Sequence, residues 1–166
     1  FRIRVIDAAT SRGVPLARVT TLAGVSRLTD NAGLIAYHEP GWMNRDTFFF
    51  VESPGYEFPA DGFGNAGRAL DARAGGEAVL ALRRRYPAQR LYRVTGAGLW
   101  LDSVLLGVAP PIRHPLNNAG VVGQDSVHTA IYRARLFWLW GDTTHIRYPL
   151  AANFKVTCAT SLLPAQ

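Results

Sequence analysis

The feature that most constrains the fold of this chain is an unbroken apolar stretch at residues 136–140, LFWLW. A strand with one face in water alternates apolar and polar residues, whereas a strand that is apolar at every position needs cover on both faces. We therefore expect residues 136–140 to be the buried middle strand of a meander. The stretch ends abruptly at Gly141-Asp142-Thr143, which is typical of a turn.

The residues around this stretch predict its neighbours. Residues 126–132 and 134–140 straddle Arg133, a spacing that favours a tight antiparallel hairpin, and residues 154–160 are the expected third strand. Stacked sheets or radially packed propeller blades would cover such a meander. A ring needs at least four blades of roughly forty residues each. The chain is therefore expected to hold only an incomplete propeller-like antiparallel sheet.

The first half of the chain predicts a series of short strands. Charged residues make up only 18% of the sequence, whereas glycine (16) and proline (10) are plentiful, which favours short extended segments separated by turns. The expected strands are FRIRVID, ARVTTL, VSRLT, GLIAYHE, TFFFVES and EAVLALRR. The predicted fold class is all-β, with a β-sandwich over residues 1–85 and a second unit over residues 86–166. The run Arg83-Arg84-Arg85 and Pro87 mark this boundary.

The order of turns in the first half resembles that of transthyretin-like (carboxypeptidase-regulatory-like) β-sandwiches, an Ig-like architecture also similar to repeats of bacterial surface adhesins. The matching residues are Asp7, Thr10, Pro15, Thr29, Asp30, Gly33, Gly55 and Tyr56. The resemblance covers residues 1 to about 85. It implies a non-catalytic module used for spacing, docking or contact with sugars. The same residues also serve as ordinary turn formers.

Two motifs in the second half resemble the first blade of five-bladed β-propeller glycosidase-like proteins. Residues 123–126 (GQDS) match the start of the innermost strand, and residues 138–143 (WLWGDT) match a strand end of that family. The resemblance covers residues 120–161. It implies an exported, polysaccharide-active protein that is similar to glycoside hydrolases. Because the chain stops at Gln166, it does not include a complete ring.

Two aspartates are the candidate catalytic residues. Hydrolysis of a glycosidic bond needs two carboxyl groups, one that protonates the leaving oxygen and one that activates water or attacks the sugar. Asp125 would face the central pocket if it begins an inner propeller strand, so we expect it to be the base or nucleophile. Asp142 is the second candidate. Its alternative role is to accept backbone N–H groups and hold the turn.

Three further side chains are candidates for substrate binding: Gln124, His128 and Tyr148. Gln124 has the alternative of pairing with backbone, and His128 that of an ordinary surface imidazole. The tryptophans of residues 136–140 are core residues first and sugar platforms second. No metal site and no cofactor are predicted, because the histidines lack the spacing of a zinc site and Cys158 is the single cysteine.

Charge and composition limit the partners. The net charge of +6 arises almost entirely from arginine, but no basic helix or basic run interleaved with stacking aromatics is present, so nucleic acid is not expected. No apolar run approaches the ~18 residues of a membrane span. The expected partners are a polysaccharide or surface glycan and a further chain or C-terminal segment that completes the sheet. Because the chain opens on Phe1, we expect either a processed mature chain or a trimmed one. If the removed piece was a signal peptide, the protein is secreted or on the cell surface.

A non-catalytic alternative remains open. The chain would then be a structural or adhesive subunit, or a carbohydrate-binding module, that completes its core with a partner chain. The presence of one acid in each motif fits this alternative as well as it fits catalysis.

Overall fold

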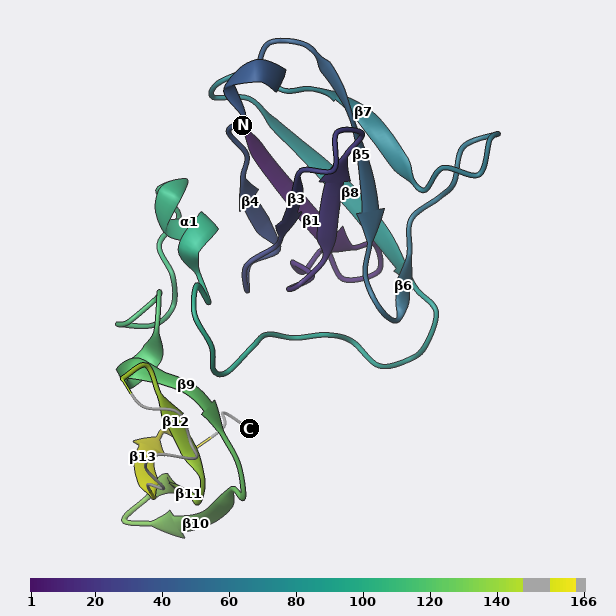
Figure 1. Cartoon of the computed structure of the whole chain (residues 1–166). Coiled ribbons are helices and arrows are strands. Elements are labelled where there is room, and N and C mark those ends of the chain that lie inside the picture. Colours follow the sequence, from purple (N-terminus) through teal and green to yellow (C-terminus); the bar gives the residue numbers. More distant parts are fainter. Residues whose placement is uncertain (148–155, 164–166) are drawn as a thin grey trace. The chain divides into compact units, whose positions relative to one another are not determined.

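The structure, a computed structural model, describes residues 1–147 and 156–163 (Figure 1). The regular elements of this part are strands, apart from one short helix, α1 (Leu101–Leu105), and two 3-10 turns, Pro40–Trp42 and Asn118–Gly120. The all-β prediction is therefore confirmed. None of the helices in the described part is long and apolar enough to cross a membrane.

Eight strands of the first half form two four-stranded sheets, and the predicted β-sandwich is confirmed. The strands are β1 (Arg2–Asp7), β2 (Arg18–Thr21), β3 (Ser26–Leu28), β4 (Leu34–Ala36), β5 (Asp46–Glu52), β6 (Tyr56–Glu57), β7 (Gly67–Asp71) and β8 (Glu77–Arg84). One sheet has the order β4-β1-β8-β6 and the other β3-β2-β5-β7. The central pair β1 and β8 is parallel, in register from Arg2 and Glu77 to Asp7 and Leu82.

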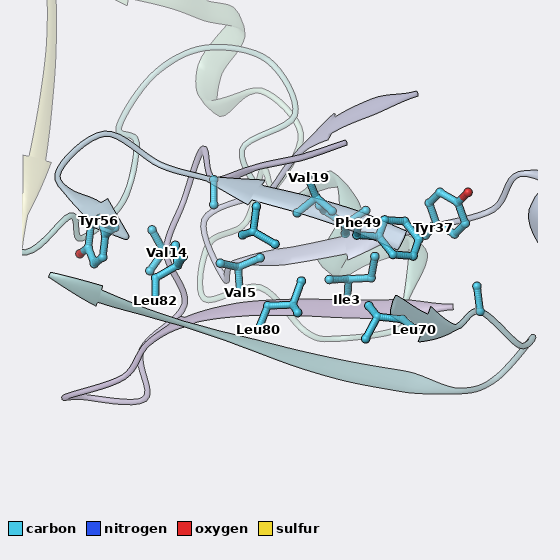
Figure 2. Close-up of a cluster of buried hydrophobic side chains, with 14 residues drawn as sticks. Ile3, Val5, Val14, Val19, Tyr37, Phe49, Tyr56, Leu70, Leu80 and Leu82 are labelled. Atoms are coloured by element: carbon cyan, nitrogen blue, oxygen red, sulfur yellow. The ribbon is translucent and has the colours of Figure 1, made fainter. Parts of the chain in front are cut away.

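Alternate residues of these strands form the core between the sheets. Figure 2 shows that the buried side chains of β1 and β8 converge with those of β2 and β5. The labelled members from these four strands are Ile3, Val5, Val19, Phe49, Leu80 and Leu82. Each such side chain stabilises the fold by about 1.5–3 kcal/mol when fully buried. The period of two in the sequence thus determines which side of each strand faces inward.

Asp30 connects the sandwich to α1. Its carboxylate is buried, and Oδ1 accepts the N–H groups of Ala32 and Leu34 in its own turn at 2.9 and 3.1 Å. The other oxygen, Oδ2, accepts both the N–H and the hydroxyl of Ser103 in α1, at 2.7 and 2.6 Å. Four donors therefore satisfy a carboxylate that would be costly to bury alone.

Helix α1 covers the edge of the first sheet. Asp102 Oδ1 accepts the N–H of Ala36 on edge strand β4 at 2.8 Å. The side chain of Asn31 pairs with the backbone of Arg93, donating to its carbonyl at 2.9 Å and accepting from its N–H at 2.7 Å. The contact of Asp102 occupies a donor that an exposed edge strand would offer to another chain.

The chain divides into two compact units. The first comprises Phe1–Arg93 and Gly98–Pro115, and the second comprises Val94–Ala97 and Leu116–Gln166. The segment that carries α1 thus packs with the sandwich, whereas the sequence boundary after residue 85 assigned it to the second unit. The reason for the difference is the long-range hydrogen bonding of Asp30 and Asn31, which composition does not reveal.

The location of Asp102 leads to a pH-dependence prediction. Burial, and then the negative charge of Asp30, raise the pKa of Asp102 above 3.8, although the Ala36 N–H opposes this shift. The folded chain therefore holds this proton more tightly than the unfolded chain, and stability falls as pH rises from about 4 through the raised pKa. Asp102→Asn keeps an oxygen for Ala36 and removes the ionisation. We expect a smaller fall in stability over this window.

Urea unfolding at a series of pH values tests this expectation. The variant should be at least as stable as the wild type at neutral pH, and the two should converge or cross at acidic pH. Asp46→Asn, at an exposed position at the start of β5, is the matched control. A variant whose stability runs parallel to the wild type at every pH would contradict the prediction.

The second unit contains the predicted hairpin. Strands β10 (His128–Tyr132) and β11 (Arg135–Trp140) pair antiparallel, with Tyr132 opposite Arg135. The two turn residues, Arg133 and Ala134, have φ values of 50° and 58°, as a two-residue type I′ turn requires. The third strand, β13 (Thr157–Ser161), pairs with β11 where the sequence predicted it. Residues 154 and 155 of that prediction lie outside the described part.

The middle strand β11 is not covered on both faces by the described residues. Leu139 is 39% exposed, and the other apolar side chains of the strand are half-buried. Every fully buried apolar side chain in the described part belongs to the first unit. The expected burial of residues 136–140 is therefore not reached within residues 1–147 and 156–163.

Candidate functional site

The structure brings Asp125 and Asp142 together. Asp125 directly follows β9 (Val121–Gln124), and Asp142 directly precedes β12 (Thr143–His145). These two strands are paired, with Gln124 opposite Thr143. One step beyond this pair, the N–H of Asp125 donates to the carbonyl of Asp142 at 2.9 Å. The N–H of Gly141 donates to the carbonyl of Asp125 at 3.1 Å.

Two consecutive residues, Gly141 and Asp142, therefore share Asp125 as their partner across the ladder. This is the arrangement of a β-bulge, a device that redirects side chains and is frequent beside active sites. A Cβ added to Gly141 would lie 3.1 Å from the Cβ of Ser126, so glycine allows the two chain segments to approach. Residues paired across an antiparallel ladder have Cα atoms about 4.5–5.5 Å apart. The backbones of the two predicted catalytic residues are thus adjacent.

The two carboxylates differ in their surroundings. Asp125 is exposed, and its Oδ1 accepts the N–H of Ser126 at 2.6 Å, which leaves Oδ2 open to solvent or substrate. Asp142 is half-buried, and no hydrogen bond to its carboxylate occurs among the described residues. The alternative role of Asp142, accepting several backbone N–H groups to hold the turn, is thus not observed in this part of the chain.

Gln124 has a structural contact. Its amide donates to the hydroxyl of Thr157 at 3.0 Å, and that hydroxyl lies 2.7 Å from the hydroxyl of Thr143. The three side chains join the β9–β12 pair to β13. The amide of Gln124 therefore pairs with a side chain, not with backbone, and lies beside Asp125 in the sequence.

His128 lies on another strand, and Tyr148 is not among the described residues. His128 is exposed at the start of β10, opposite Leu139. It is on the face of the sheet opposite to Trp138 and Trp140, because alternate residues of a strand face opposite ways.

The two tryptophans of β11 form a half-buried pair. Their rings are parallel within 6° and 5.9 Å apart, and the indole N–H of Trp138 donates to the hydroxyl of Ser161 at 2.9 Å. The rings stack on each other on one face of the sheet. This geometry supports their assignment as core residues whose cover is incomplete.

The structure also contains a cleft that sequence reasoning missed. It has a volume of about 710 Å³, lies in the first unit and is lined partly by Arg18, Glu52, Tyr56 and Arg90. Arg90 is 75 residues from one of its hydrogen-bond partners and 37 from another. No local pattern could therefore have indicated this site, and the sequence boundary had assigned Arg90 to the second unit.

The described residues suggest no metal centre. Within residues 1–147 and 156–163, no group of three histidine, cysteine, aspartate or glutamate side chains is placed to hold a metal ion. Cys158 is an exposed thiol on β13.

Comparison of the chain with protein-family models, with curated proteins and with solved structures finds no match. The two family resemblances therefore depend only on the motifs quoted from the sequence. Both resemblances stay predictions, and the function of the chain is inferred from its own geometry.

Proposed function

We propose that this chain is part of an exported protein that cleaves a polysaccharide, with Asp125 and Asp142 as its two catalytic carboxyl groups. The observation that carries the proposal is the backbone pairing of these residues across the bulge. Glycosidases place two carboxyl groups about 5–9.5 Å apart, within the range open to two side chains on adjacent ladder positions.

The surroundings of the two residues support their assignment to different roles. Asp125 is the base or nucleophile, because its exposed carboxylate can contact water or a sugar carbon directly. Asp142 then donates the proton to the leaving oxygen. Gln124, held by Thr157, positions the start of this segment. His128 and Tyr148 are proposed to contact substrate outside the pair.

The test is the replacement of each aspartate in the complete protein. Asp125→Asn and Asp142→Asn should each lower the release of reducing ends from the hydrolysed polysaccharide by about 10²–10⁴-fold, the usual contribution of a positioned acid or base. The assay uses a panel of neutral and acidic polysaccharides. Asp61→Asn, an exposed aspartate on a loop of the first unit, is the control and should leave turnover unchanged.

Unaltered turnover in Asp125→Asn would remove this residue from the mechanism. A loss in that variant accompanied by unfolding would not support the proposal, so circular dichroism of each variant accompanies the assay. An isosteric amide at an exposed position is expected to leave the fold intact.

A second candidate is a non-catalytic structural or adhesive subunit, or a carbohydrate-binding module. It is favoured by β11, whose apolar side chains are not fully covered, and by β10, whose residues are exposed along its whole length at the edge of its sheet. Such an edge can pair with a strand of another chain. A native particle that contains a second chain and hydrolyses no polysaccharide of the panel would favour this candidate.

A further inference from the structure

Two adjoining clefts lie over β2 and β5 of the sandwich, and together they are called the groove. The cleft of about 710 Å³ adjoins another of about 540 Å³, because Arg18, Val51, Glu52 and Ala66 line both. The groove extends from Phe50 and Thr20 at one end to β6 and Arg90 at the other. A groove of this kind suits a linear polymer better than a compact ligand.

The charged side chains of the groove are paired, with one exception. Glu52 pairs with Arg18 at 3.4 Å, and Glu57 pairs with Arg85 at 3.4 Å. Arg90 has no carboxylate partner among the described residues. The lining of the larger cleft thus contains three arginines and two glutamates, with one positive charge uncompensated.

Neutral groups hold the guanidinium of Arg90 in place. Its Nη1 donates to the carbonyl of Pro15 at 3.1 Å and to the hydroxyl of Ser53 at 3.4 Å, and its Nη2 donates to the carbonyl of Pro54 at 3.4 Å. A guanidinium has five N–H donors, so two are unused. The group is therefore oriented in advance, at little further entropic cost to a ligand that accepts from it.

We infer that this groove binds an acidic polysaccharide, with Arg90 receiving the carboxylate of a uronic acid residue. Phe50 and Phe58, which line the two parts of the groove, offer apolar surface to the C–H faces of sugar rings. The inference deepens the proposed function by naming a substrate class, and it depends on that proposal only for the ligand being a polysaccharide.

The pattern of charge favours carboxylated sugars over nucleic acid. A phosphodiester polymer carries one charge for every few ångströms of its length. Such a polymer is held mainly by several phosphate contacts, but only one guanidinium in the lining of the larger cleft is not paired with a carboxylate among the described residues. A sugar polymer also offers hydroxyl groups and C–H faces to the groove, so a single charge-assisted contact to one carboxylate suits it. A neutral glycan would leave Arg90 without its charged partner.

The test is isothermal titration of the full chain with tetragalacturonate and an alginate tetramer as probes. Cellotetraose serves as the neutral probe, and a short single-stranded DNA serves as the phosphodiester probe. We expect binding of at least one acidic tetramer and weak or no binding of cellotetraose and DNA. Arg90→Gln should weaken acidic-tetramer binding by about 10- to 100-fold, the usual effect of a charge-assisted hydrogen bond.

The matched control is Arg45→Gln, which removes the same charge from an exposed position just before β5, at the opposite end of that strand from Glu52. It should leave affinity within about twofold. A second measurement uses the wild type alone and so does not depend on folding of a variant. In amide chemical-shift mapping, the acidic tetramer should perturb Val51, Ser53 and Arg90 more than residues of the second unit.

Several outcomes would overturn the inference. They are equal affinity for cellotetraose, preference for DNA, an unchanged affinity in Arg90→Gln, shifts confined to the second unit, and no binding at millimolar tetramer. Asp125→Asn separates this inference from the proposed function, because it should lower hydrolysis by about 10²–10⁴-fold and retain acidic-tetramer binding. If the protein hydrolyses polysaccharides but binds none at the groove, only the inference about the groove is contradicted, and the proposed function stands.

Discussion

Replacing Asp30 with alanine is expected to destabilise the first unit by roughly 3–5 kcal/mol. The variant leaves four donors without their acceptor: the N–H groups of Ala32, Leu34 and Ser103 and the hydroxyl of Ser103. Each buried donor that loses its partner costs about 1–3 kcal/mol, less where water can enter. The loss is therefore a large part of the stability of a domain of this size.

Asp30→Asn gives a graded comparison. The amide keeps one oxygen for Ala32 and Leu34, but its NH₂ group then faces the N–H of Ser103, so the cost should be smaller than that of alanine. Ser103→Ala removes one donor and leaves the backbone bond in place, which should cost about 1 kcal/mol. Urea unfolding followed by circular dichroism measures all three variants.

Hydrogen exchange shows where the effect of Asp30→Ala is located. The amides of α1 and the N–H of Ala36 should exchange faster, because the helix loses its attachment to the edge strand β4. A variant with wild-type stability and unchanged exchange in α1 would show that Asp30 does not hold the helix.

The sequence predicted those parts of the fold that depend on neighbouring residues. The strand predicted over residues 1–7 is β1, and the spacing around Arg133 correctly predicted the β10–β11 hairpin. Both features arise from contacts within a few residues of the chain. The parallel pairing of β1 with β8 was not predicted, because its partners are 75 residues apart.

Helix α1 was missed for a related reason. Its five residues are too few to show a helical period. It is placed by Asp30, 73 residues earlier in the sequence. The glycines at 98 and 107, both with positive φ, are the only local signals that bound it.

The candidate sites likewise combine features that neighbouring residues predict with features that depend on residues distant in the sequence. Asp125 and Asp142 were singled out separately by their motifs, and their proximity follows from the hairpin that lies between them in the sequence. The location of Arg90 depends on Pro15, Ser53 and Pro54. These three residues are distant in sequence and contribute neutral acceptors, so no motif could have signalled them.

The close approach of Gly33 to Gly13 leads to the second prediction of a large loss of stability. A Cβ on Gly33 would lie 2.3 Å from the carbonyl oxygen of Val5 and 2.6 Å from the Cα of Gly13, and the residue has a φ of +73°. Gly33→Ala should therefore cost roughly 3–5 kcal/mol, from steric overlap with backbone and from left-handed strain. The contacted atoms are backbone and cannot rotate away. The carbonyl of Gly33 also accepts from the N–H of Val5 at 2.8 Å, so displacement of this turn would disturb β1.

Three other glycines separate the steric cause from the left-handed strain when the free energy of unfolding is measured in urea. Gly24 has a φ of +80° and open space around its Cβ position, so Gly24→Ala should show only the cost of left-handed strain, about 1–2 kcal/mol. Gly41 has neither constraint, and Gly41→Ala should be nearly neutral. Gly13→Ala tests the overlap alone, because its Cβ would lie 1.9 Å from the carbonyl oxygen of Ala32 without a positive φ. If Gly33→Ala cost no more than Gly24→Ala, the turns around Gly13 and Gly33 would have to be farther apart than the structure places them.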